Sequence, residues 1–194
     1  MTVNSQRSVH ASILCCAVCI ATTDTASAAG NDARSILSAS GIKGGLVVHV
    51  GCGNGQLTAA LRATDKFLVH GLEPNAASVA AARAHVESVG LAGKVSIAQW
   101  SVGRLPYADN IVNLLVLEGT PAVAPREALR VLCPGGAIME KQGEEWAMTS
   151  KPRPANIDEW THFLHDGGGN AVAQDERVGP PRHIQWLADP LWIR

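Results

Sequence analysis

The sequence predicts an α/β fold: a doubly wound sheet of about five parallel strands with helices on both faces. Short apolar runs alternate with stretches of helical periodicity, and this alternation is typical of parallel sheets. A glycine-rich turn, Gly51–Gly55, follows the first apolar run and precedes a helix. Hydrophobic residues make up 46% of the 194 residues, which is enough for the packed core of one domain. Right-handed crossovers then place ligand sites beyond the carboxyl ends of the strands.

Each element has its own signal in the chain. Asn31 is a candidate cap for the first helix, and Gly41 ends that helix. The first strand is apolar apart from His49, as expected for a strand buried on both faces. The third helix begins after Asn75, and Pro134-Gly135-Gly136 ends the last helix. In order, the predicted elements are helix 32–40, strand 46–50, helix 56–63, strand 66–72, helix 76–89, strand 94–99, strand 111–117, helix 125–132 and strand 137–141.

The alternation stops after Lys141. Residues 143–194 are rich in Pro, Gly, Trp and His and show neither helical nor strand periodicity. Four of the five tryptophans lie in this part of the chain. We therefore divide the chain into residues 1–28, 29–142 and 143–194.

The first segment has the pattern of a secretory signal peptide. A basic start precedes a short apolar run, Ala11–Ala21, and Ala26-Ser27-Ala28 matches an A-x-A cleavage site. The run is too short to span a bilayer, so no transmembrane span is expected after cleavage. We expect an exported protein, periplasmic or secreted, or a cytoplasmic one if the signal is not used. A lipoprotein anchor at Cys16 or Cys19, or a buried N-terminal helix, fits the pattern less well.

Charge and cysteine content give no support for a nucleic-acid site or a zinc site. The net charge is −1 and no basic run is present, so nothing indicates binding to nucleic acid. After signal cleavage, Cys52 in the glycine turn and Cys133 before the fifth strand remain. We expect them at opposite places in the sheet and therefore unpaired, and two isolated cysteines do not make a zinc site.

The glycine turn reads Gly51-Cys52-Gly53-Asn54-Gly55. A dinucleotide-binding loop has the pattern G-x-G-x-x-G, and its third glycine would stand at the position of Gln56. The pattern G-x-G-x-G instead resembles the first motif of class I S-adenosylmethionine-dependent methyltransferases, in particular the methyltransferase type 11-like domain. The resemblance implies a Rossmann-like fold and S-adenosylmethionine as cofactor, held by Gly51, Cys52, Gly53 and Gly55. A nicotinamide oxidoreductase is disfavoured.

An acid stands at the end of the second strand, where nucleotide cofactors are recognised. Glu73 follows Gly53 by 20 residues, and its carboxylate can accept both hydroxyls of a ribose. A simpler interpretation is a carboxylate favoured by the start of the next helix. The resemblance places Pro74 in the same cofactor site, and it implies that Gln99 and Trp100 line the adenine.

Two further segments resemble motifs of the same family. Leu105–Asp109 is similar to its LPF-x-D segment, and Glu127–Gly136 to its E-x-x-R-V-L-x-P-G-G segment. The resemblance covers residues 36–141, and it departs at His49 and at Asn113, where the family has acids. His49 is a candidate cofactor contact through the loop backbone or simply a buried core histidine. The family's usual sixth and seventh strands are expected to be missing.

The fourth strand ends in Leu117-Glu118-Gly119-Thr120-Pro121, which lacks the N/D-P-P-Y motif of amino-methylating enzymes of this fold. We therefore expect a small-molecule methyl acceptor. Methyl transfer is an in-line displacement in which alignment supplies most of the rate, and a base is needed only if the acceptor holds its proton. Glu118 is the best-placed candidate for this base and for a cofactor contact. A solvated carboxylate at a strand end is the simpler interpretation.

The last segment carries a second resemblance. Residues 156–194, with W-T-H, V-G-P-P-R and Q-W, are similar to the segment that leads into the first blade of exported bacterial quinoprotein-like (PQQ-like) β-propellers. The resemblance implies a propeller domain downstream. His162 and His165 with Asp166 have a spacing compatible with metal ligands, but no third ligand is fixed, so no metal site is predicted.

Two functions from different classes follow from these observations. One is an S-adenosylmethionine-dependent methyltransferase that acts on a small molecule, supported by the glycine turn and Glu73. The alternative is a non-catalytic methyltransferase-like module with an interaction or structural role in an exported propeller protein. The expected export favours the alternative, because S-adenosylmethionine is made and used in the cytoplasm.

Overall fold

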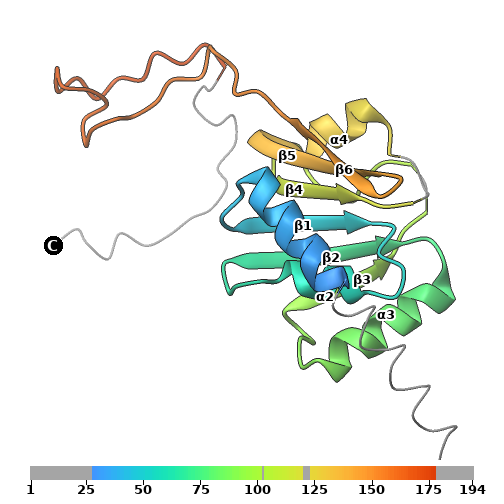
Figure 1. Ribbon diagram of the computed structural model, residues 1–194. Helices are drawn as coiled ribbons and strands as arrows, with labels where there is room; N and C mark the ends of the chain where they lie inside the picture. Colours follow the sequence, from blue (N-terminus) through green and yellow to red (C-terminus); the bar gives the residue numbers. More distant parts are fainter. Residues whose placement is uncertain (1–27, 102, 120–122, 178–194) are drawn as a thin grey trace, which may run out of the picture. The chain divides into compact units, whose positions relative to one another are not determined.

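The computed structural model describes residues 28–101, 103–119 and 123–177. At its centre is a six-stranded sheet with the order β3-β2-β1-β4-β5-β6 (Figure 1). Strands β1 to β5 pair in parallel, while β6 is antiparallel to β5. The chain divides into two compact units after Pro152, and the sheet lies in the first unit. The predicted α/β fold is confirmed.

The elements alternate as the sequence predicts. The strands are β1 (Gly45–Val50), β2 (Phe67–Glu73), β3 (Val95–Gln99), β4 (Val112–Leu117), β5 (Leu132–Gln142) and β6 (Glu145–Ser150). The helices are α2 (Gln56–Leu61), α3 (Ala76–Ser88) and α4 (Pro125–Val131), preceded by a helix over residues 28–40. The strand order reverses direction between β1 and β4. In such sheets, ligands bind beyond the carboxyl ends of the strands at this reversal.

One predicted helix start is confirmed and another is wrong. Asn75 caps α3, where its side-chain oxygen accepts backbone N–H groups at 2.8 and 3.2 Å. Residues 28–40 are all helical, so Asn31 lies inside the first helix instead of capping it. Ala28 and Ala29 have a high helix propensity, which favours helix before Asn31 in spite of Gly30. Gly41, with a φ of 66°, follows the helix as predicted.

The fifth strand begins earlier than expected. Because β5 starts at Leu132, directly after α4, Pro134-Gly135-Gly136 lies within the strand instead of separating it from the helix. The pairing with β4 is irregular here: Val112 pairs with Leu132, and Leu114 pairs with Ala137. This irregularity accommodates the extra residues of β5, as a bulge does.

Strand β6 corrects the expectation that residues 143–194 contain no strand. A two-residue turn, Gly143-Glu144, joins β5 to β6, and Gly143 has a φ of 66°. Glycine at the first position of a two-residue turn is typical of tight hairpins. The sheet therefore has six strands instead of about five, and it continues past residue 142, where we placed the end of the α/β segment.

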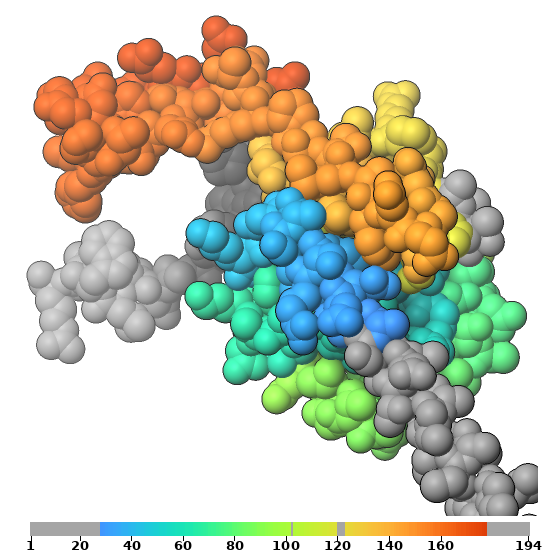
Figure 2. Space-filling model, in the orientation of Figure 1, coloured from blue at the N-terminus to red at the C-terminus, as the bar shows by residue number. Residues whose placement is uncertain are grey.

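Two hydrophobic clusters cover the two faces of the sheet. The first joins Val47 of β1 to helix 28–40, α2 and α3, and the second joins Val48 to α4. His49 lies on the same face as Val47, because alternate residues of a strand share a face. Helix 28–40 and β6 lie side by side (Figures 1 and 2), and Trp146 of β6 packs against the first cluster there.

Several expectations concern the ends of the chain. The proposed signal peptide, except for its residue 28, and most of the propeller-like motif after residue 177 lie outside the described residues. In the described part of the second unit, His165 is buried and its Nε2 lies 2.5 Å from Asp158 Oδ2. Among the described residues, no group of three potential ligands could hold a metal ion, and no helix is both long and apolar enough to cross a membrane.

Candidate functional site

The turn between β1 and α2 requires glycine for different reasons at its three positions. Gly51, Gly53 and Gly55 have φ values of 79°, 50° and 80°, a region that favours glycine. A Cβ on Gly51 would lie 1.8 Å from the backbone oxygen of Glu118, and a Cβ on Gly55 would lie 2.9 Å from the Cβ of Ala82. A Cβ on Gly53 would meet no atom of the described residues within 4 Å. Gly51 and Gly55 are therefore packing positions, whereas Gly53 borders open space.

Glu73, the last residue of β2, lies against this turn. Its Oε2 accepts the N–H of Gly53 at 2.9 Å, and its Oε1 accepts the N–H of Asn75 at 3.3 Å. The residue is only 8% exposed, and each carboxylate oxygen retains a lone pair for a further donor. The structure thus brings the turn and the predicted acid together. The contact with the start of α3 also agrees with the simpler interpretation of Glu73.

The end of β3 lies beside Glu73, but its two predicted cofactor residues are placed differently. Gln99 pairs with Glu73 across the two strands and donates from Nε2 to the carbonyl of Pro74 at 3.0 Å. The ring of Trp100 belongs to the second hydrophobic cluster, and its Nε1 donates to the carbonyl of Arg104 at 3.1 Å. Gln99 and Pro74 therefore border the edge that carries Glu73, while the Trp100 ring is part of the core.

The side chain of Cys52 faces the interior. The residue is 4% exposed and belongs to the first hydrophobic cluster. Burial raises the pKa of its thiol to about 12. The thiol therefore stays protonated at neutral pH and is no nucleophile. Within the described residues, Cys52 and Cys133 are both free.

His49, two residues before the turn, is fully buried on β1. Its Nδ1 lies 2.8 Å from Oγ1 of Thr58 on α2. Its Nε2 lies 3.5 Å from Oε2 of Glu118 and has no hydrogen-bond partner within the described part of the chain. A buried polar atom without a partner costs about 1–3 kcal/mol. One ring nitrogen of His49 therefore has a hydrogen-bond partner and the other has none among the described residues. The two nitrogens face Thr58 and Glu118 instead of the loop backbone.

Glu118 follows β4 and lies between His49 and Lys141. Its Oε1 accepts a hydrogen bond from Lys141 Nζ at 2.6 Å. The neighbouring His49 ring and the Lys141 ammonium lower the pKa of Glu118 to about 2, against the opposing effect of burial. So weakly basic a carboxylate is a poor proton acceptor at neutral pH, and this geometry does not favour Glu118 as a general base. Lys141 was not among the predicted site residues; its signal in the sequence is a cation at the end of an apolar strand.

Asn113, where the family has an acid, lies near the amino end of β4. Its Oδ1 accepts the N–H of Leu46 at 2.9 Å, and its Nδ2 lies 3.4 Å from the sulfur of Cys133. A Cβ on Gly45 would lie 2.2 Å from the same Oδ1. Asn113 therefore joins β1, β4 and β5 at the end of the sheet opposite to the glycine turn, and this departure from the family does not touch the site.

The Glu127–Gly136 motif also has a structural role. Arg130 donates to Glu127, to Asp109 and to two backbone carbonyls of the Leu105–Asp109 segment. Glu127 in turn accepts the N–H of Leu105 at 2.7 Å. The motif therefore fastens that segment to α4.

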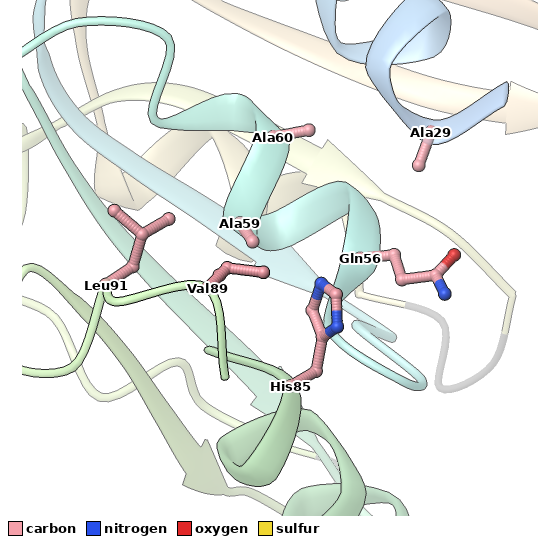
Figure 3. Close-up of a pocket in the computed structure, with 7 residues that line it drawn as sticks. All are labelled: Ala29, Gln56, Ala59, Ala60, His85, Val89 and Leu91. Atoms are coloured by element: carbon pink, nitrogen blue, oxygen red, sulfur yellow. The ribbon is translucent and has the colours of Figure 1, made fainter. Parts of the chain in front are cut away.

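Two pockets lie near the sheet. A pocket of about 260 Å³ is lined by residues of β4, β5, β6, α4 and the connection before α4: Leu117, Val123, Pro125, Ala128, Leu129, Ile138, Glu140 and Thr149. Another, of about 270 Å³, is lined by helix 28–40, α2, α3 and the segment after α3 (Figure 3). Gln56 and His85 are its polar residues, and it contains none of the predicted site residues.

The carboxyl ends of β1, β2 and β4 fit S-adenosylmethionine in three respects. Gly53 leaves a cradle that a Cβ would fill, and its backbone can approach a ligand closely. The Glu73 carboxylate beside it can accept ribose hydroxyls. Glu118 and Lys141 are partly exposed and carry a negative and a positive charge. The amino-acid end of the cofactor carries an ammonium and a carboxylate group, which are complementary to them.

Comparisons with known proteins agree with this assignment. Residues 47–136 match a family model described as a methyltransferase domain. A protein from Methanococcus maripaludis, provisionally assigned as an S-adenosyl-L-methionine-dependent methyltransferase, is 26% identical with a TM-score of 0.53; the match covers 57% of this chain and 53% of that one. A search of curated proteins found no match.

Two further solved structures show the fold alone. The [4+2]-cyclase SpnF is 24% identical with a TM-score of 0.51, over 57% of this chain and 43% of that one. Geranyl diphosphate C-methyltransferase from Streptomyces coelicolor A3(2), solved with S-adenosyl-L-homocysteine, is 20% identical with a TM-score of 0.51. The match covers 57% of this chain and 42% of that one. The chain thus spans about half the length of these proteins. Residues 47–136 therefore resemble methyltransferase domains, and the first of these structures is of a protein provisionally assigned to the S-adenosylmethionine-dependent ones.

Proposed function

We propose that this chain is an S-adenosylmethionine-dependent methyltransferase that acts on a small-molecule acceptor. The observation that carries the proposal is the glycine turn, in which Gly53 borders open space while Glu73 binds its N–H group. The family match over residues 47–136 includes both residues and supports the same conclusion.

The chain's contribution to such a reaction is binding and alignment. The cofactor, when bound, supplies a methyl group on a positively charged sulfur. The glycine turn lets the backbone approach the ligand, and Glu73 is placed to accept its ribose hydroxyls. Displacement at a methyl carbon needs donor and acceptor in line, and positioning supplies most of the rate. This mechanism requires no general base from the chain, which agrees with the ion-paired state of Glu118.

The pocket of about 260 Å³ on the α4 side of the sheet is the proposed acceptor site. Leu117 and Glu140 pair at the end of β4 and both line this pocket, which supports a position near the edge that carries the glycine turn. Its lining is mainly apolar, with the Glu140 carboxylate and the Thr149 hydroxyl among its polar groups. Such a lining is typical of small-molecule sites. A net charge of −1 gives no support for a nucleic-acid acceptor.

Titration calorimetry with S-adenosylhomocysteine tests the cofactor assignment. We expect dissociation constants in the micromolar range, and we expect Glu73→Ala to weaken binding by about tenfold or more, because a buried acceptor is lost. Glu87→Ala, on the exposed side of α3, is the matched control and should bind like the wild type. Absence of binding to the wild type at millimolar ligand would refute the proposal.

A further inference from the structure

We propose that the Glu118–Lys141 ion pair is a binding site for the amino-acid end of the cofactor. In this proposal the pair opens, Glu118 takes the α-ammonium group, and Lys141 takes the α-carboxylate. The inference rests on the proposed function, and it assigns a role to Lys141, which lies beyond the end of the family match at residue 136.

The position of the pair relative to the glycine turn is the first argument. The backbone of Glu118 packs against Gly51, and its N–H donates to the carbonyl of Val50 at 3.0 Å. Lys141 is the next residue along β5 after Glu140, which pairs with Leu117. The side chains of Glu118 and Lys141 are 30% and 28% exposed, so a ligand at the turn can reach both charges.

The incomplete bonding of Glu118 is the second argument. Its Oε1 is bound to Lys141, and its Oε2 lies 3.5 Å from His49 Nε2, beyond the length of a charge-assisted hydrogen bond. That nitrogen is fully buried and lacks a partner within the part of the chain that the structure describes. Buried polar atoms in a purely structural cluster are normally all bonded. One carboxylate oxygen therefore remains for a ligand, and an ammonium group has three N–H groups to offer.

The surroundings of Lys141 are the third argument. Its ammonium lies 5.5 Å from the centroid of the Trp146 ring, a distance at which a cation is attracted to the ring face. This contact with β6 supports the lysine when Glu118 turns to a ligand. Opening the pair exchanges one ion pair within the protein for two with the ligand, so neither charge is left unpaired in a partly buried site.

An α-amino-acid zwitterion has the ligand chemistry that matches this pair. It carries an ammonium and a carboxylate on one carbon, and S-adenosylmethionine ends in such a group. Two analogues separate the contributions of these charges. Decarboxylated S-adenosylmethionine retains the amine without the carboxylate, and 5′-methylthioadenosine lacks both.

Titration calorimetry with S-adenosylmethionine and its decarboxylated analogue tests the role of Lys141. We expect the wild type to bind S-adenosylmethionine about tenfold more tightly than the analogue. Lys141→Met should lose this preference, and Lys141→Arg should keep it, since a cation remains. A preference of unchanged size in Lys141→Met would overturn the assignment, and so would equal affinity of the wild type for the two ligands.

Glu118→Gln tests the other half of the site. We expect this variant to bind both amine-containing ligands about tenfold more weakly and 5′-methylthioadenosine unchanged. Equal weakening for all three ligands would indicate a structural role for Glu118 and would contradict the proposal. If Glu118→Gln does not fold, the Lys141 comparison still decides. A wild type that binds none of the three ligands refutes the proposed function itself, whereas binding without the expected preferences refutes only this inference.

Discussion

At the scale of single residues, Gly51 and Gly53 have similar backbone conformations but very different surroundings. A Cβ at Gly51 would lie 1.8 Å from a backbone oxygen, while a Cβ at Gly53 meets nothing within 4 Å. We therefore expect Gly51→Ala to destabilise the protein by more than about 4 kcal/mol, because backbone would have to move. Gly53→Ala should cost about 1–2 kcal/mol, for its positive φ alone.

Urea unfolding of the two glycine variants checks this difference. Gly53→Ala should remain folded and lose affinity for S-adenosylhomocysteine, because its methyl group would occupy the space proposed for the ligand. Equal stability of the two variants would show that the turn adapts to a side chain at Gly51. Unchanged affinity in Gly53→Ala would place the ligand elsewhere.

The depressed pKa of Glu118 gives a prediction about pH. Because its pKa falls from 4.5 to about 2 on folding, the ionised carboxylate is favoured in the folded state. This stabilisation is present above the unfolded pKa and is lost as the pH falls from 4.5 towards 2. We expect Glu118→Gln to lower the free energy of unfolding by about 1–3 kcal/mol at neutral pH and progressively less below about pH 4. Urea unfolding across this pH range measures the difference; a difference independent of pH would contradict the prediction.

At the scale of elements, the contact between α4 and the Leu105–Asp109 segment depends on Arg130. Its guanidinium bonds Glu127, Asp109 and two backbone carbonyls at once. We expect Arg130→Ala to destabilise the protein, because Glu127 loses its cation and two backbone carbonyls lose their donor. Arg130→Lys should recover little of this loss, since an ammonium cannot reproduce the planar set of donors.

Hydrogen exchange of the Leu105 amide is a direct readout of that contact. The amide donates to Glu127, so Arg130→Ala should speed its exchange. Arg126→Ala, on the exposed side of the same helix, serves as the control and should change neither stability nor exchange. Protection that persists in Arg130→Ala would show that the segment is held by its apolar packing instead.

The limits of element prediction in this chain have clear physical causes. Strands β1 to β4 were predicted within one or two residues, because buried parallel strands are continuous apolar runs. β6 was missed because an edge strand needs no such run: most of its residues are exposed, and its turn has a single glycine signal. The start of the first helix was misplaced because Asn31 suits a cap, while the preceding alanines extend the helix through their propensity.

At the scale of the whole molecule, the parts of the candidate site that depend only on the order of the strands along the chain were predictable. The glycine turn and Glu73 follow two adjacent parallel strands, so sequence spacing brings them together. Lys141 was not predictable in the same way, because its contact with Glu118 depends on the register between β4 and β5. The position of the Trp100 ring was not predictable either, because it depends on packing within the second hydrophobic cluster.

The first residue of the mature protein tests the proposed export. Cleavage after Ala28 would leave Ala29 as the first residue, still within helix 28–40. The helix would keep its contacts with the core, because Ala33 and Ile36 are 2% and 0% exposed and lie further along. If the signal is used, we expect the mature protein to begin at Ala29 and to unfold with the same free energy as the full-length chain, within about 0.5 kcal/mol. Mass spectrometry of the N-terminal peptide from producing cells identifies the first residue. A mature chain that retains Met1 would contradict export and would leave the proposed methyltransferase in the compartment that supplies S-adenosylmethionine.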